Sequence, residues 1–391
     1  MNPSSSRRFL LYSHDGQGLG HARRHLAIAR AIITLDPTAS VLIATGVEEL
    51  PKPGLPPNVE VLKLPSLRKI ANGRYESRRL LLAPRETRAL RSALLLAAVK
   101  SFRPHVVLSD KHPFGASGEF RTALTAARRL GARAALGLRD ILDDPATVLR
   151  EWRPHGLPDA IVDHYDEVLI YGEREVFDAV REYNFPEELA ERSHFCGYVI
   201  NQPPAATPSA AQRPLVLATA GAGEDGFQIL ATFLQAAAGA PWDAMAVSGP
   251  HCPPEHSTRL ATLAVAAGAG WHTYVPALET RIASAAAVVC MGGYNTLGEA
   301  LASGVPTVCV PRVVPRREQL IRARAFQKLG LLQVITPDAL TPEKLRACLV
   351  AALSSNPDAA TLDFSGASNS AHRLLALADD AAGVPAEPVF A

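Results

Sequence analysis

Residues Ala287–Gly330 read AVVCMGGYNTLGEALASGVPTVCVPRVVPRREQLIRARAFQKLG. They contain two strand–loop–helix motifs in succession. In the first, Ala287–Met291 is an apolar run of strand length, Gly292–Gly293 provides a turn, and Asn295–Ser303 carries helix-forming residues. In the second, the apolar strand Thr307–Val310 is followed by a basic loop with prolines and by another helix. The pattern predicts an α/β domain built on a parallel sheet.

The loops after these two strands are expected to lie side by side at one edge of the sheet. Open parallel sheets bind their ligands at that edge, outside the carboxyl ends of the strands. A glycine turn that leads into a helix also offers backbone N–H groups and the positive end of the helix dipole to an anion. The sequence therefore predicts an anion-binding site at Gly292–Gly293.

The segment GGYNTLGEALASGVPTVCVP, with the polar loop and Gln319 after it, resembles the nucleotide-sugar-binding stretch of glycosyltransferase family 28. It is also similar to the donor motif of the plant small-molecule glycosyltransferases. The resemblance implies the GT-B fold, in which two Rossmann-like, doubly wound parallel-sheet domains face each other across a cleft. It further implies that the C-terminal domain holds a UDP- or dTDP-sugar and that the N-terminal domain holds the acceptor.

The resemblance assigns roles to single residues of this stretch. It places Glu299 on the ribose hydroxyls, a task suited to an ionised carboxylate that only accepts hydrogen bonds. It places Glu318 and Gln319 on the hydroxyls of the donor sugar. The residues themselves leave an alternative open, because Thr296 and Glu299 fit a T-x-x-E capping box. Asn295 and Thr296 are likewise either helix N-caps or ligands of a diphosphate oxygen.

Met291 stands where the plant pattern has a phosphate-binding histidine, which makes phosphate binding depend more on Gly292, Gly293 and Asn295. The predicted donor-binding residues are Gly221, Ala222, Gly223, Val275, Gly292, Gly293, Tyr294, Asn295, Thr296, Glu299, Arg316, Glu318 and Gln319.

The composition is that of an ordinary water-soluble protein. The chain has 391 residues, of which 48% are hydrophobic and 20% charged, and its net charge is +2. This length suffices for two domains, and the charge gives no indication of nucleic-acid binding. Residues 1–8 lack the apolar region of a signal peptide, which predicts a cytoplasmic protein. The five cysteines contain no C-x-x-C pair, so we expect buried reduced thiols and neither disulfides nor a zinc site.

The first strand of the chain is also followed by glycines and a histidine. Phe9–Ser13 is apolar, the turn contains Gly16, Gly18 and Gly20, and a helix begins near His21. This looks like the first loop of family 28, whose glycines end in a histidine at the mouth of the cleft. A histidine at a helix start can equally be structural. The helical period turns Arg24 largely away from the sheet.

A general base must take the proton of the acceptor, and polar residues after the N-terminal strands are candidates. The candidates, in order, are His21, Asp15, Asp110 and Asp140. Predicted acceptor-side residues are Gly18, Gly20, His112 and Arg139. The alternative for the aspartates is capping of the helix that follows each strand.

A rival motif is G-x-G-x-x-G, formed by Gly221, Gly223 and Gly226 after the strand Leu215–Ala218. In a dinucleotide-binding fold the next strand ends in an acidic residue that holds the ribose. The next strand here is followed by Ser248, which disfavours an oxidoreductase.

A basic stretch covers residues 63–91, with nine lysines and arginines against two glutamates. It is either a solvated helix face or a surface for an anionic acceptor or anionic membrane, because Leu80–Leu82 lie among the arginines.

We expect an N-terminal domain over 1–200, a linker over 201–214 and a C-terminal domain over 215–370. A last helix within 371–391 is expected to cross back to the N-terminal domain. Predicted strands are Phe9–Ser13, Val41–Ala44, His105–Ser109, Ala134–Leu138, Val168–Tyr171 and Cys196–Ile200, then Leu215–Ala218, Ala244–Val247, Trp271–Val275, Val288–Met291, Thr307–Val310 and Leu332–Ile335. Glu173–Tyr183 is predicted as helix.

The predicted reaction is transfer of a sugar to an acceptor hydroxyl or amine, with the inverting outcome that the resemblance implies. No D-x-D spacing occurs, so we expect no metal, and the nucleotide-sugar serves as co-substrate with no further cofactor. The acceptor is a small molecule or lipid-linked, possible peripheral membrane contact is left open, and no nucleic acid is involved. The alternatives are a nucleotide-sugar 2-epimerase and a non-catalytic sugar-nucleotide-binding protein.

Overall fold

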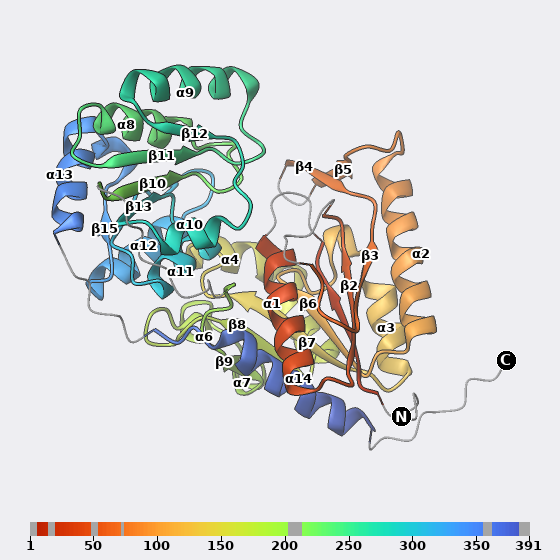
Figure 1. Cartoon of the computed structure of the whole chain (residues 1–391). Helices are drawn as coiled ribbons and strands as arrows, with labels where there is room; N and C mark the ends of the chain where they lie inside the picture. Colours follow the sequence, from red (N-terminus) through yellow and green to blue (C-terminus); the bar gives the residue numbers. More distant parts are fainter. Residues whose placement is uncertain are drawn as a thin grey trace. The chain divides into compact units, whose positions relative to one another are not determined.

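The computed structural model describes residues 6–14, 20–47, 54–71, 74–201, 213–354 and 362–382. Asp15, Gly16, Gly18 and most of the predicted linker lie outside these residues. The chain forms two compact units (Figure 1). The first comprises Met1–Asp140, Pro145–Val199 and Asp363–Ala391, and the second comprises Ile141–Asp144 and Ile200–Leu362.

The first unit is built on a parallel sheet with the strand order β3-β2-β1-β6-β7-β8-β9. Its strands are β1 (Arg8–Tyr12), β2 (Ser40–Thr45), β3 (Val59–Lys63), β6 (Val106–Asp110), β7 (Arg133–Arg139), β8 (Glu167–Tyr171) and β9 (Ser193–Phe195). The central strands are buried almost throughout, as a parallel sheet covered on both faces requires. The order reverses at β1, so the switch point of the sheet lies between β1 and β6.

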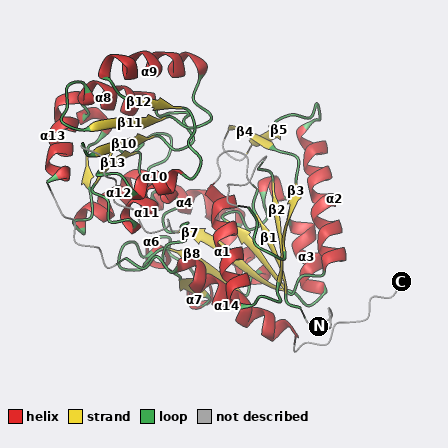
Figure 2. Cartoon of the chain, viewed as in Figure 1, coloured by secondary structure: helices red, strands yellow, loops and turns green. Residues whose placement is uncertain are grey.

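Helices and one antiparallel hairpin complete this unit (Figure 2). The helices are α1 (Gly20–Leu35), α2 (Pro84–Phe102), α3 (Arg121–Arg129), α4 (Pro145–Trp152), α5 (Leu157–His164), α6 (Ala179–Glu182), α7 (Glu187–Glu191) and α14 (Gly366–Ala382), with short 3₁₀ turns η2 (Ala116–Gly118) and η3 (Arg153–His155). The hairpin pairs β4 (Leu67–Ala71) with β5 (Arg74–Ser77). Helix α14, drawn in blue, packs beside α1, drawn in red.

The second unit has a parallel sheet with the order β12-β11-β10-β13-β14-β15. Its strands are β10 (Leu215–Thr219), β11 (Asp243–Val247), β12 (Gly270–His272), β13 (Ala287–Cys290), β14 (Thr307–Cys309) and β15 (Gln333–Val334). Its helices are α8 (Phe227–Ala237), α9 (Pro254–Ala267), α10 (Leu278–Ala283), α11 (Tyr294–Ala302), α12 (Glu318–Lys328) and α13 (Pro342–Leu353), with the 3₁₀ turn η4 (Pro337–Ala339). This is the strand order of the Rossmann fold, and its switch point lies between β10 and β13.

The doubly wound parallel sheets predicted from the sequence are confirmed, and some elements differ. The prediction of a strand over Cys196–Ile200 is wrong, because β9 ends at Phe195. Only Ala179–Glu182 of the predicted helix Glu173–Tyr183 is helical. The basic stretch is not one helix, since it forms the β4–β5 hairpin before α2 begins at Pro84.

The five cysteines are free, but only three of them are buried. Cys196, Cys290 and Cys309 are buried, whereas Cys252 and Cys348 are partly exposed. No helix within the described ranges combines the length and the apolar character needed to cross a membrane.

Candidate functional site

The first unit presents a pair of side chains at its switch point that can act as a base and its orienting group. His21 lies in the first turn of α1, and Asp110 is the last residue of β6. The His21 Nδ1 atom is 2.9 Å from Asp110 Oδ2. The Asp110 side chain is fully buried, whereas the His21 side chain is 16% exposed. A substrate can therefore reach the imidazole while the carboxylate orients it from below.

Asp110 is held in its ionised form by its cationic neighbours. Burial favours the neutral carboxyl, but the charges of Arg24 and His21 outweigh burial and hold the pKa of Asp110 well below its ordinary value. The Arg24 guanidinium approaches Asp110 Oδ2 with Nη2 at 2.8 Å and Nε at 3.2 Å. The expectation that Arg24 points away from the sheet is wrong, since its side chain is 3% exposed and faces β6.

Three other histidines lie near this pair, and burial favours the neutral form of two of them, His14 and His25. His14 follows β1, and its ring centroid is 4.4 Å from that of His112 and 5.3 Å from that of His21. Burial lowers the pKa of His14 well below its ordinary value, and His112 and His21 add to the effect. Burial also lowers the pKa of His25, on α1, to about 4. The rings of His14 and His25 therefore add no positive charge beside Asp110, whereas the Arg24 guanidinium does.

The remaining candidates of the first unit lie at the same edge of the sheet. Arg139 ends β7, and the buried Asp140 follows it and packs against Gly172, just after β8. Gly20 is the first residue of α1. Asp15 and Gly18 lie outside the described residues, so their roles stay predictions. The structure thus brings His21 together with Asp110, and it brings His112 together with His14.

In the second unit the loop after β13 forms a tight turn that leads into α11. Gly292 has φ +79°, and a Cβ at this position would lie 3.0 Å from Cys309 Sγ and 3.3 Å from the carbonyl oxygen of Gln319. A glycine is therefore required by conformation and by space. The N-cap of α11 is Gly293, and no side chain caps the helix. Its first N–H groups are thus available to an anion.

This geometry excludes the capping interpretation of Thr296 and Glu299, and their roles as ligand contacts stay predictions. Because α11 begins at Tyr294, Thr296 is its third residue and Glu299 its sixth. The alternative of a capping box is wrong, and so is the alternative that Asn295 or Thr296 is the N-cap. Glu299 is buried, and the Oδ1 atom of Asn295 is buried with no hydrogen-bond partner in the described part of the chain. Asn295 can therefore accept a hydrogen bond from a ligand.

Arg312, which the sequence did not single out, organises the loop before α12. Its Nη2 donates to Glu318 Oε1 at 2.7 Å, and its Nη1 donates to Asp225 Oδ2 at 3.1 Å. Its backbone N–H donates to Gln319 Oε1 at 3.1 Å. Arg312 therefore fixes both predicted sugar-contacting residues against the loop after β10. An arginine in a basic loop gives no sign of this role in the sequence.

Arg316 is engaged by an aspartate. Its Nη1 donates to Asp143 Oδ2 at 3.0 Å, while Asp143 Oδ1 accepts from the backbone N–H of Arg317 at 2.8 Å. The Asp143 side chain is 2% exposed and that of Arg316 is 23% exposed, so the carboxylate is buried while the guanidinium still reaches water. A role of Arg316 at the diphosphate stays a prediction, and part of its charge is already balanced.

The glycines after β10 allow two loops to pass closely. Gly223 has φ +101°, and a Cβ there would clash with the carbonyl oxygen of Ser248. Ser248 directly follows β11, at the position where a dinucleotide fingerprint requires an acidic residue. Gly221 and Ala222 lie in this loop, and the partly exposed Val275 follows β12. These donor-site candidates share the carboxyl edge of the sheet with Gly292.

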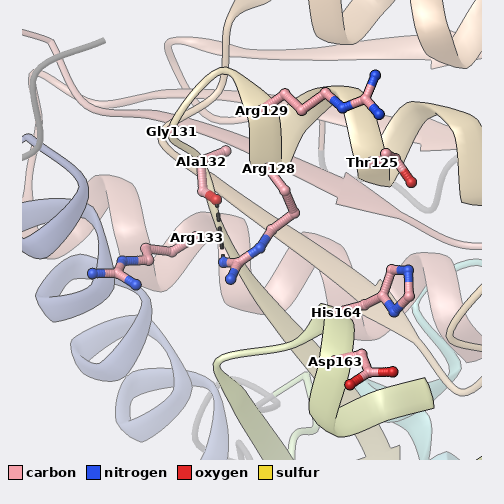
Figure 3. A pocket seen from close by; sticks show the side chains of 8 residues that line it. All are labelled: Thr125, Arg128, Arg129, Gly131, Ala132, Arg133, Asp163 and His164. Carbon is pink, nitrogen blue, oxygen red and sulfur yellow. Dashed lines mark hydrogen bonds between the residues drawn. The ribbon is translucent and has the colours of Figure 1, made fainter. Parts of the chain in front are cut away.

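A cavity of about 500 Å³ lies at the opposite, amino-terminal edge of the first sheet (Figure 3). It is lined by Thr125, Arg128, Arg129, Gly131, Ala132, Arg133, Asp163 and His164. Arg128 and Arg133 both form ion pairs with Asp166, which balances part of the positive charge. The cavity is remote in the sheet from the carboxyl edge, where such folds bind ligands, so we do not assign the predicted site to it.

Comparisons with known proteins agree with this description. The two-unit fold is similar to that of UGT71G1 from Medicago truncatula, solved in complex with UDP-glucose, with a TM-score of 0.60, 14% identity and coverage of 97% of this chain and 99% of that one. MurG from Acinetobacter baumannii has a TM-score of 0.52, 14% identity and coverage of 96% and 94%. These are GT-B glycosyltransferases, so the predicted GT-B fold is confirmed.

Residues 262–374 match the Glycosyltransferase family 28 C-terminal domain, and the predicted resemblance to that family is thereby confirmed. A curated relative from Mycobacterium tuberculosis is 33% identical over 118 residues. It is a UDP-N-acetylglucosamine–N-acetylmuramyl-(pentapeptide) pyrophosphoryl-undecaprenol N-acetylglucosamine transferase. The matched part is 30% of this chain and spans only 27% of that relative.

Proposed function

We propose that the protein is an inverting glycosyltransferase that moves a sugar from a UDP- or dTDP-sugar to an acceptor hydroxyl or amine without a metal ion. One observation carries the proposal. The family 28 match covers the Gly292 turn and α11, where the structure presents an uncapped helix N-terminus. The positive end of that helix suits the diphosphate, whose negative charge grows as the sugar leaves.

The first unit supplies the second half of the chemistry. With its Nδ1–H donated to Asp110, His21 keeps a lone pair on Nε2 and can take the proton of the acceptor. The ionised Asp110 stabilises the imidazolium that forms. This arrangement favours His21 over Asp140 as the base, while Asp110 orients it.

Product analysis tests the proposal. The purified protein is incubated with UDP- and dTDP-sugars, each with and without a panel of acceptors. A transferase forms a glycosylated product only with an acceptor, whereas an epimerase changes the sugar without one. A binding protein forms no product and is only stabilised by the nucleotide-sugar. The glycosyltransferases among the comparisons favour the first outcome, and either of the others would reject the proposal.

Glu299 provides a test of donor binding. We expect Glu299→Gln to weaken the donor nucleotide by about tenfold to a hundredfold, because hydrogen bonds to a charged group are worth about 1.5–3 kcal/mol. Calorimetry with UDP and dTDP measures the Kd. The exposed Glu255 on α9 gives a matched control, Glu255→Gln, which should bind normally. Equal affinities of the two variants would remove Glu299 from the ribose site.

The acceptor side carries an apolar patch among arginines, which we call the leucine patch: Ile70, Leu80, Leu81 and Leu82. Leu81 is completely exposed, and the other three are 37–46% exposed. Arg78, Arg79 and Arg85 are exposed beside it. The ring of Tyr75, in the same hairpin as Ile70, is 6.1 Å from that of His14, which in turn is 5.3 Å from the ring of the proposed base His21. This surface suits an anionic lipid headgroup layer and a lipid-linked acceptor.

We therefore expect the triple variant Leu80→Ser/Leu81→Ser/Leu82→Ser to bind anionic phospholipid vesicles at least tenfold more weakly. Burying one leucine contributes about 1.5–3 kcal/mol, which is tenfold or more in affinity. Vesicle co-sedimentation measures this effect. Val265→Ser, at an exposed apolar position on α9, serves as the control. If the wild-type protein does not bind the vesicles, the lipid-linked acceptor is rejected in favour of a soluble small molecule.

A further inference from the structure

We propose that Arg24 is a positioning residue that controls which nitrogen of His21 carries the proton. The inference rests on the proposed role of His21 as the base. Arg24 lies one turn after His21 on α1 and is buried. Its Nη2 atom is 2.8 Å from Asp110 Oδ2 and also 2.8 Å from His21 Nδ1. Three groups thus meet at one point, because His21 Nδ1 itself is 2.9 Å from Asp110 Oδ2.

The hydrogen-bonding rules allow only one of two arrangements at His21. An arginine carries only donors, and a neutral imidazole has one donor and one acceptor nitrogen. If Nδ1–H donates to Asp110, then Nε2 is the acceptor and His21 can act as a base. If Nδ1 accepts from Arg24, then Nε2 carries the proton and the imidazole cannot remove one from a substrate. Asp110 and Arg24 therefore compete for the same nitrogen.

The carboxylate geometry makes this competition close. Both the Arg24 guanidinium and the His21 imidazole contact Asp110 Oδ2. The other oxygen, Oδ1, is buried with no hydrogen-bond partner in the described part of the chain. Arg24 is always charged, so its positive charge offsets part of the attraction between the Asp110 carboxylate and His21. Among the described residues, the charged and titratable groups near this point include His14 after β1, His25 on α1 and Tyr171 on β8, with Lys111 and His112 after β6 acting on His14. Of the charges that lower the pKa of Asp110, that of Arg24 has the largest effect.

The consequence concerns which tautomer of His21 is populated. With Arg24 present, Asp110 Oδ2 also accepts from the guanidinium, so it holds the Nδ1–H of His21 less firmly. Without Arg24, the Nδ1–H of His21 is the remaining donor to Oδ2, and the base-competent tautomer becomes more populated.

Two variants test this inference. For Arg24→Gln we expect the ratio of the two neutral tautomers of His21 to shift towards Nδ1–H by about tenfold, because a charge within about 4–6 Å has an effect of about that size. We expect Arg24→Lys, which keeps the charge and loses the planar fork, to shift the ratio less. Long-range ¹H–¹⁵N NMR of the histidine side chains, without substrate, measures the ratio. Arg30→Gln, on the same helix, is the control and should leave the ratio unchanged.

The outcomes separate this inference from the proposed function. An unchanged tautomer population in both Arg24 variants would overturn the role of Arg24, whatever the activity. A changed tautomer in a protein that transfers no sugar would support Arg24 and reject the transferase. If Arg24→Gln does not fold, Arg24→Lys must still show a tautomer shift, and its absence would reject the inference.

Discussion

Replacing His21 by alanine is expected to lower kcat by about a hundredfold or more, the usual contribution of a general base. The imidazole is the only part of the pair that a substrate can reach, since Asp110 is fully buried beneath it. The predicted donor-binding residues belong to the second unit, so the Kd for the nucleotide should stay unchanged. Steady-state kinetics and calorimetry on the same preparation measure both effects.

A suitable control is the exposed His155, in η3, whose replacement by alanine should leave kcat unchanged. If His21→Ala kept the kcat of the wild-type protein, Asp140 or Asp15 would be the general base instead. Loss of donor binding together with turnover would instead mean that His21 is a phosphate ligand. Each result therefore assigns the histidine a different role.

The largest expected loss of stability follows from replacing Arg91, a buried arginine of α2. Its Nε and Nη2 donate to the two carboxylate oxygens of Glu119 at 2.6 and 2.5 Å, and its Nη1 donates to the carbonyl oxygen of Pro65. The Tyr12 hydroxyl also donates to Glu119 Oε1, at 2.6 Å. Both charged side chains are essentially inaccessible to water. Removing one partner of such a pair leaves the other charge buried and uncompensated.

We expect Arg91→Met to lower the free energy of unfolding by about 3–5 kcal/mol. Adding Glu119→Gln should recover part of the loss, because it removes the stranded charge. Urea denaturation of the first unit measures both changes. Arg68→Met breaks an exposed ion pair with Glu76 in the same unit and should have a much smaller effect. If Arg91→Met lowered the free energy of unfolding as little as Arg68→Met, the prediction would be wrong, and Glu119 would have to be solvated in the variant.

Much of the fold was predictable because buried parallel strands have a local sequence pattern. The six predicted strands of the second unit overlap β10 to β15, since each is a short apolar run beside a glycine or proline. The donor turn was predictable for a related reason. Only glycine suits the conformation and the space at Gly292, so the sequence marks the turn.

The missed features depend on contacts between distant parts of the chain. Arg24 and Asp110 are 86 residues apart, and Arg312 and Asp225 are 87 residues apart. Helical periodicity alone predicted that Arg24 points away from the sheet. A buried arginine becomes favourable only when a carboxylate pairs with it, and Asp110 is distant in the sequence. The predicted start of α11 was one residue late, and the observed start excludes a capping box at Thr296 and Glu299.

Helix α14 has a consequence for the order in which the protein is made. It buries Ala371, Leu374 and Ala378 within the first unit, next to α1, and Arg373 pairs with Glu167 just at the start of β8. The first unit is thus begun by residues that precede the second unit in the chain and finished only after the whole second unit has been synthesised. Until then, the apolar face of α1 that α14 covers is open, although domains usually fold in the order of their synthesis. The nascent chain must carry that exposed surface through most of its translation, which makes this stage the natural point for a chaperone to act.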